Sequence, residues 1–285
     1  MEIKKILLGG CSFVNGFDIF CDKYNIQLYT DLWYVWFKTL TDDQKSEIQN
    51  TMTLGGKLKN AFNSELVDMS MPGWSNDNIA KKMIDYISNN LDSIDTTSTL
   101  VVIGWTENHR FPFINQGHAL NVNPFNINHA INYTNLLKNN LSEADRTHDR
   151  VKRYDSNIEL YNKLIGWGEI WNNDDMSIIA YSHHMSLILL LQWFLEKHNI
   201  KYCFFNSLDM QLTNKDTHGD IYPTDYLVDW QNWYPWNDKN SYSNFSWYNF
   251  IKNEPANFTK TKHPSIHGLE LLSTPLIDFI RKNYF

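Results

Sequence analysis

The sequence predicts an α/β fold built on a short parallel sheet in one continuous domain. Short apolar runs typical of buried strands alternate with amphipathic segments typical of helices. The strand candidates are residues 3–8, 66–69, 99–103 and 201–205. This alternation favours a parallel sheet with helices on both faces. With 285 residues, the chain is long enough to bury a substantial core.

The helix candidates follow from apolar periodicity and capping residues. Ser75 or Asn76 can cap a helix with one apolar face, made of Ile79, Met83, Ile84 and Ile87. Two longer helices are expected at 157–171 and 176–198, and a last one from about Ser265, with an interruption near Pro275. The apolar stretch 187–195 is far shorter than the ~20 residues that span a bilayer, so it predicts a buried helix.

Other segments are less regular. Gly9-Gly10 and Gly104 are expected to end their strands, and Gly55-Gly56 to form a turn after aromatic residues at helical spacing. Residues 111–150 form a polar insertion with a helix near 131–140. Residues 211–258 form an aromatic-rich insertion before the last helix.

Charge and cysteine content exclude several classes of function. The net charge is −7 and no long basic run occurs, which disfavours nucleic-acid binding. Three cysteines without a CxxC pair indicate neither a disulfide framework nor a cysteine zinc site. The first residues lack the pattern of a signal peptide, so a cytoplasmic protein is expected, with release by lysis or assembly into a virus particle left open.

Four polar segments lie where this fold places its sites, at the carboxyl ends of strands or the start of a helix. They are residues 9–16 with Ser12, 72–76 with Gly73, 104–110, and 263–268 with His263. Taken alone, a serine after such a strand can equally be a helix N-cap. The pair His263 and His267, spaced four residues apart, has no third ligand in view, so no metal site is expected.

The order of these four segments resembles the SGNH, or GDSL-type, hydrolase superfamily. The resemblance covers about thirty residues of the chain. It implies a three-layer α/β/α, flavodoxin-like fold and a serine ester hydrolase that needs neither metal nor organic cofactor. Gly10-Cys11-Ser12 stands where the family has Gly-Asp-Ser, which makes Ser12 the implied nucleophile. Cys11 is the less favoured alternative.

The resemblance also implies an oxyanion hole. Backbone N–H groups of Ser12 and Gly73 would form part of it, and Thr106 stands at the position of the oxyanion Asn in the GxND segment. Either Thr106 donates, or Asn108 takes its place, or the third donor is missing. Each such donor is typically worth about 10² to 10³ in rate.

His263-Pro264 with Gly268 matches the last family segment, so His263 is the implied base in preference to His267. The family Asp three residues earlier is replaced by Lys260. A backbone carbonyl would then orient His263, or a remote acid such as Asp209 or Glu254 would replace the missing one.

The expected substrate is a small-molecule or glycan ester. The expected enzyme is a carbohydrate O-deacetylase or another small-acyl esterase. The candidate substrate contacts are Arg110, Trp74, Trp105 and Trp236. The aromatic segment before His263 could stack on sugar rings, pack internally or form a homo-oligomer interface. The His183-His184 doublet is interpreted as capping or packing. The alternative function is a catalytically inactive relative that binds glycans or serves as a structural protein.

Overall fold

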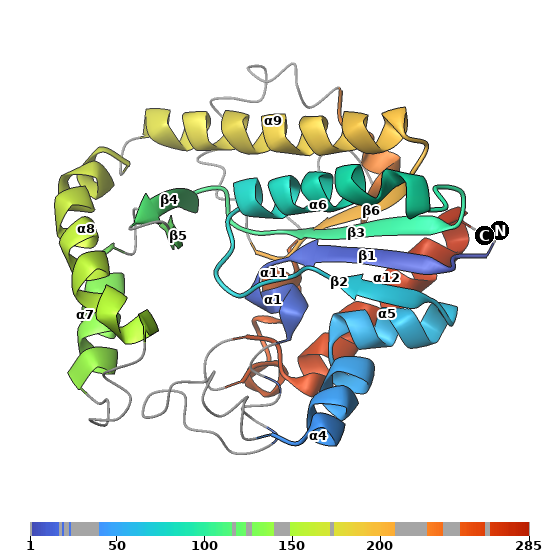
Figure 1. The fold of residues 1–285 in the computed structure, drawn as a ribbon, viewed down its shortest axis with the longest axis horizontal. Helices are drawn as coiled ribbons and strands as arrows, with labels where there is room; N and C mark the ends of the chain where they lie inside the picture. The colour runs from blue at the N-terminus through green and yellow to red at the C-terminus, as the bar shows by residue number, and fades with distance from the viewer. Residues whose placement is uncertain are drawn as a thin grey trace.

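The computed structural model describes residues 2–16, 19, 23, 40–115, 118–123, 127–139, 149–171, 174–208, 227–235, 246–259 and 263–284. Within these residues the largest sheet has five strands in the order β2-β1-β3-β6-β7, and all its pairings are parallel (Figure 1). The strands are β1 (Lys5–Gly10), β2 (Glu65–Asp68), β3 (Thr99–Trp105), β6 (Lys201–Asn206) and β7 (Trp233–Tyr234). The predicted α/β fold with a parallel sheet is confirmed.

Helices cover both faces of this sheet (Figure 1). One face packs against α6 (Asn76–Asn90) and α9 (Asp174–Lys197), and the other packs against α1 (Ser12–Asn15), α5 (Leu54–Phe62), α11 (Trp247–Ile251) and α12 (Ile266–Tyr284). Because strand side chains alternate between faces, Leu7 belongs to the first core and Leu8 to the second. The result is three layers, α/β/α.

The helix α6 begins as the sequence predicts. Ser75 is its N-cap, and the Ser75 hydroxyl accepts a hydrogen bond from the Asn78 N–H. Ile79, Met83 and Ile87 are buried in the core against the sheet. The spacing of these apolar residues therefore predicted correctly which face of α6 is buried against the sheet.

Of the glycines expected to end strands, Gly10 is the last residue of its strand, whereas Gly9 and Gly104 lie inside theirs. Gly9 and Gly10 belong to β1, and Gly104 belongs to β3, where it is the register partner of Gly10. The strands continue because packing, rather than a turn, requires these glycines. A Cβ on Gly9 would lie 2.8 Å from Ile103 Cδ1, too close for any other residue without movement.

Gly55 and Gly56 do not form a turn, since both lie in the first turn of α5. A Cβ on Gly56 would lie 2.4 Å from the carbonyl oxygen of Gln49, in the preceding π-helical turn η1 (Ile48–Met52). These glycines therefore allow two helical segments to approach closely. Thr53 caps α5 by accepting the Gly56 N–H.

The last helix is not interrupted at Pro275, which lies inside α12. Leu272 before it and Leu276 after it are both buried in the same core. Burial of this continuous apolar face offsets the roughly 3 kcal/mol cost of an internal proline.

The insertion after β3 contains more structure than the sequence predicts. Its elements are the antiparallel hairpin β4 (Phe111–Asn115) and β5 (His118–Val122), then α7 (Ile127–Asn139) and α8 (Asp149–Trp171). Both helices begin earlier than expected. Val122, Ile127 and Tyr161 form a small core of their own. Figure 1 shows this part beyond the carboxyl ends of the strands.

The remaining short elements are α4 (Asp42–Glu47), η2 (Leu91–Ser93), η6 (Trp230–Asn232) and η8 (Pro255–Asn257). In the aromatic segment, Trp230, Trp233 and Trp247 are buried, which confirms internal packing for that part. The aromatic residues between 24 and 39 lie outside the described residues. Among the helices that are described, none is long and apolar enough to cross a membrane.

Candidate active site

Ser12 is the first residue of α1, which follows β1 after the single residue Cys11. Val14 brings this helix directly onto the sheet: a Cβ on Gly10 would lie 2.3 Å from Val14 Cγ2, and one on Gly104 would lie 2.4 Å from the same atom. Because Gly10 and Gly104 have no side chains, α1 can pack directly against the ends of β1 and β3, and this packing positions Ser12. The Ser12 N–H belongs to the first-turn donors that lack an intrahelical acceptor.

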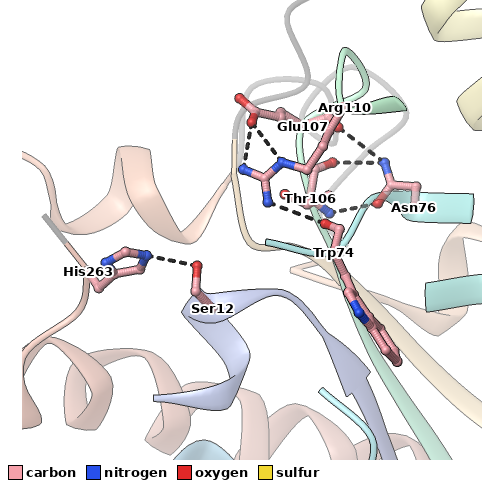
Figure 2. Close-up of polar contacts among 7 residues, drawn as sticks. All are labelled: Ser12, Trp74, Asn76, Thr106, Glu107, Arg110 and His263. Atoms are coloured by element: carbon pink, nitrogen blue, oxygen red, sulfur yellow. Dashed lines mark hydrogen bonds and ion pairs between the residues drawn. The ribbon is translucent and has the colours of Figure 1, made fainter. Parts of the chain in front are cut away.

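The Ser12 Oγ and the His263 Nε2 lie 2.8 Å apart (Figure 2). In the neutral tautomer with the proton on Nδ1, Nε2 accepts the Ser12 hydroxyl proton. The Phe13 ring packs against the imidazole, with the ring centroids 5.3 Å apart. Two residues 251 positions apart in the chain therefore form one hydrogen-bonded pair.

A short antiparallel contact holds the backbone of His263. The Thr259 N–H donates to the His263 carbonyl at 2.8 Å, and the His263 N–H donates to the Thr259 hydroxyl at 3.3 Å. Phe258 and Pro264 form the adjoining β-bridge. Pro264 is thus part of this bridge, and the last helix begins two residues later, at Ile266.

Gly268 brings this contact close to the last helix. The Ser265 hydroxyl accepts the Gly268 N–H, as an N-cap does. A Cβ at position 268 would lie 2.1 Å from the carbonyl oxygen of Asn257 in η8. Only glycine fits there, which gives a packing reason for the spacing between His263 and Gly268.

Gly73 lies in the loop between β2 and α6, with a φ of 80° that favours glycine. Nothing lies within 4 Å of where its Cβ would be. The Met71 N–H donates to the Gly10 carbonyl at 3.0 Å, which ties this loop to the strand that leads to Ser12. Gly73 therefore has an open side in a loop that is bonded to the nucleophile segment.

Asn76 fixes the loop that follows β3. Its Oδ1 accepts the Thr106 N–H at 2.9 Å, and its Nδ2 donates to the Thr106 carbonyl at 3.0 Å (Figure 2). Sequence reasoning considered Asn76 only as a helix cap and missed this role. No sequence signal separates capping of the helix from bonding to a neighbouring loop, because an Asn at a helix start can do either.

The two candidate donors of this loop are buried. Thr106 is 0% exposed and Asn108 is 4% exposed. The Thr106 hydroxyl therefore does not reach an oxyanion in this arrangement, which corrects its prediction as the third donor. The role of Asn108 stays a prediction.

Arg110 is bonded within the protein. Its guanidinium pairs with the Glu107 carboxylate at 2.7 Å and donates to the Trp74 carbonyl at 3.3 Å (Figure 2). The pairing compensates its charge, so Arg110 is not a free anion-binding group in this structure. Trp74 is partly buried against the core beneath α6.

Trp105 is a core residue, which corrects its prediction as a substrate contact. It is 0% exposed and packs edge-on against the rings of His184 and Phe204. The strand continues through Gly104, so Trp105 points into the core rather than into the loop. Burial lowers the pKa of His184 to about 3, and its Nδ1 lies 2.7 Å from the Asn76 amide. His184 is thus a packing residue, as expected.

Two further histidines lie near this loop. Burial lowers the pKa of His109 to about 4. The His183 Nε2 donates a hydrogen bond to the Asp77 carboxylate, 2.9 Å away, and this bond raises the pKa of His183. His109 is therefore held neutral at physiological pH, while His183 joins α9 to the first turn of α6.

The remaining candidates have different outcomes. Cys11 is fully buried, which argues against it as a nucleophile. Glu254 is exposed at the N-cap of η8. Trp236, Asp209 and Lys260 lie outside the described residues. In the described part of the chain, no group of three or more His, Cys, Asp or Glu is placed to hold a metal ion.

The chain was compared with protein-family models, curated proteins and solved structures. None of them matches it. The residues themselves are therefore the basis for a functional interpretation.

Proposed function

We propose that this protein is a serine ester hydrolase of the SGNH type, with Ser12 as nucleophile and His263 as base. The observation on which the proposal depends is the 2.8 Å hydrogen bond between Ser12 Oγ and His263 Nε2. This distance lies within the range that general-base catalysis requires. A nucleophile and a base at hydrogen-bond distance are also the signature of an activated serine.

The topology of the sheet supports the same proposal. If only the strands of this sheet are numbered along the chain, so that β6 becomes the fourth and β7 the fifth, their order is 2-1-3-4-5. This is the order of flavodoxin-like sheets. In such sheets, ligands bind at the carboxyl ends of the strands where the strand order reverses. That point lies between β1 and β3, and Ser12 follows β1 there.

The proposed reaction is acyl transfer in two steps. His263 Nε2 takes the hydroxyl proton of Ser12 as Oγ attacks the ester carbonyl, and the resulting imidazolium protonates the departing alcohol. Water then attacks the acyl-enzyme, with His263 again accepting and returning one proton. The backbone N–H groups of Ser12 and Gly73 stabilise the oxyanion. The cycle as proposed uses no metal or organic cofactor.

The proposed substrate is a small-acyl ester of a carbohydrate. On the His263 side of the pair, the Phe13 ring contacts Tyr248, which is 36% exposed, at a centroid distance of 6.2 Å. Since His263 protonates the leaving alcohol in the proposed reaction, this aromatic surface lies on the side where the alcohol would bind. Flat aromatic faces suit sugar rings.

An inactive, glycan-binding protein is the second candidate. Two observations favour it: Lys260 stands where the family has its Asp, and the Thr106 side chain is buried. A triad without its acid can lose about 10⁴ in turnover. An oxyanion hole without its third donor also lowers the rate.

Labelling with a fluorophosphonate, read by intact mass, tests the proposal. We expect one label per wild-type molecule, no label on Ser12→Ala, and normal labelling of Ser93→Ala, which removes an exposed serine hydroxyl away from the site. Hydrolysis of acetylated sugars would then test the substrate. A folded wild-type protein that takes no label would contradict the hydrolase and favour the binding protein.

A further inference from the structure

A chain of hydrogen bonds joins the end of β2 to the end of α1. The Asn15 Nδ2 lies 3.1 Å from the Ser70 carbonyl oxygen and 3.2 Å from the Ser70 Oγ. The Ser70 Oγ lies 2.5 Å from Asp68 Oδ1, and the Ser70 N–H donates to the same oxygen at 2.8 Å. The network thus connects two segments that are 55 positions apart in the chain.

The donors and acceptors in this network are fixed by chemistry. A carbonyl oxygen only accepts, so the Asn15 atom facing Ser70 is the amide nitrogen. Asp68 Oδ1 accepts hydrogen bonds from the Ser70 N–H and the Ser70 hydroxyl, so this hydroxyl donates to Asp68 and accepts from Asn15. Every bond therefore has one direction, which makes the geometry specific.

The network joins the two segments that carry the backbone donors of the proposed oxyanion hole. Ser12 precedes Asn15 by three residues on α1, and Gly73 follows Ser70 by three residues in the loop. Ser70 is buried. The Met71 N–H also donates to the Gly10 carbonyl, which bonds the same loop to the end of β1.

We propose that Asn15 is a positioning residue that sets the spacing between the Ser12 and Gly73 N–H groups. This role rests on the proposed hydrolase function. Asn15 lies in the first of the four sequence segments (residues 9–16), but the sequence predicted no role for it as nucleophile, donor or base. Asn15 acts through Ser70 and does not itself contact the substrate.

Replacement of Asn15 by leucine, which is similar in size but cannot donate, tests this role. Oxyanion donors act mainly on the transition state, so displacing them lowers kcat and leaves KM nearly unchanged. With 4-nitrophenyl acetate as substrate, we expect kcat of Asn15→Leu to fall about 10- to 100-fold, less than the loss of a whole donor. KM should stay within about twofold.

Asn90→Leu is the matched control. The Asn90 amide also donates to a backbone carbonyl, that of Tyr86, at 2.8 Å, but it lies at the far end of α6. A purely structural loss should lower the melting temperature of both variants and leave kcat of the folded protein unchanged. Ser70→Ala removes one acceptor only, and we expect a fall of about three- to tenfold in kcat.

The outcomes separate the two proposals. A fall in kcat for Asn15→Leu but not for Asn90→Leu supports the positioning role. Wild-type kcat in Asn15→Leu, with or without a lower melting temperature, overturns it and leaves the hydrolase standing. If Asn15→Leu does not fold, Ser70→Ala decides, and an unchanged kcat there overturns the role. A wild-type protein that takes no fluorophosphonate overturns both proposals before any variant is made.

Discussion

The strands β1 and β3 are neighbours in the sheet, yet the residues that follow them are used differently. After β1, the Ser12 hydroxyl is bonded to His263, a residue from the other end of the chain. After β3, the Thr106 backbone is bonded to Asn76, and its side chain is buried. Both segments lie at the carboxyl edge of the sheet, where sites are expected. Position at this edge is therefore not sufficient for contact with a ligand.

The difference arises from what each segment packs against. Glycines at positions 10 and 104 let α1 lie low on the sheet, so Ser12 is held at the start of a helix with its hydroxyl directed to His263. The segment after β3 is instead joined to α6 and α9 through Asn76 and His184. Under the proposed function the first segment carries the nucleophile, whereas the second is bonded to Asn76 and, through Arg110, to the Trp74 carbonyl beside Gly73.

The largest effect is expected from replacing His263, the proposed base that is bonded to Ser12. Replacing His263 by alanine removes the acceptor of the Ser12 proton, so we expect fluorophosphonate labelling to slow by at least about 10³-fold. His267→Ala is the control, because His267 is an exposed histidine one helical turn further on. Equal rates in the two variants would show that His263 is not the base. The measurement is the labelling rate by intact mass.

The buried histidines near β3 should make the fold sensitive to acid. The folded pKa of His184 is about 3, below its ordinary value of 6.5, so the unfolded chain binds more protons between these values. The contribution of neutral His184 to stability is therefore fully present above about pH 6.5. It falls as the pH drops, and the folding equilibrium constant then decreases by up to about tenfold per pH unit.

Urea unfolding between about pH 7 and about pH 4.5 measures this effect. The variant His184→Asn keeps an acceptor for Asn76 and does not titrate, so its stability should decline less steeply than that of the wild type. His109, with a pKa of about 4, contributes to the remaining slope in the same direction. Parallel curves for the two proteins would contradict the assignment of His184 as a source of acid sensitivity.

Replacing Gly73 by alanine should lower kcat roughly 10- to 100-fold, because the methyl group disfavours the positive φ and the N–H then turns away. Gly166→Ala is the matched control. Both positions have open space for a Cβ, but only Gly73 has a positive φ. An unchanged kcat in Gly73→Ala would remove Gly73 from the oxyanion hole. Steady-state kinetics with an acetyl ester provide the measurement.

The smallest effect is expected at Thr106. Thr106→Val keeps the shape of the side chain and removes its hydroxyl, and the bonds from Asn76 go to the backbone and remain. Because the side chain is closed to a ligand, kcat should change by less than about threefold. A fall of 100-fold would show that the loop opens in the reaction and that Thr106 is a donor after all.

The sequence predicted the frame of the fold well. Apolar runs identified four of the sheet strands, and Ser75 marked the start of α6, because burial and capping leave local patterns. It failed at glycines. Gly56 was interpreted as a turn residue, although its role is to let α5 approach η1. A glycine needed for close packing looks the same in sequence as one needed for a turn.

The site was predicted in part. The order of the four segments led to Ser12 and His263, and the structure places these two side chains together. The bonds that hold the segments, such as Asn15 to Ser70 and Asn76 to Thr106, were missed. Polar residues in loops leave no periodic signal, and their partners become known only when distant parts of the chain meet.

The separation of Ser12 and His263 by 251 positions has a consequence for synthesis on the ribosome. α1 emerges before the bridge that precedes α12, so the proposed nucleophile is made well before the proposed base. If Ser12 and His263 act as proposed, a nascent chain with α1 already outside the ribosome lacks the group that activates the serine. The proposed nucleophile is then activated only after the segment that carries His263 has been made and has docked on the sheet.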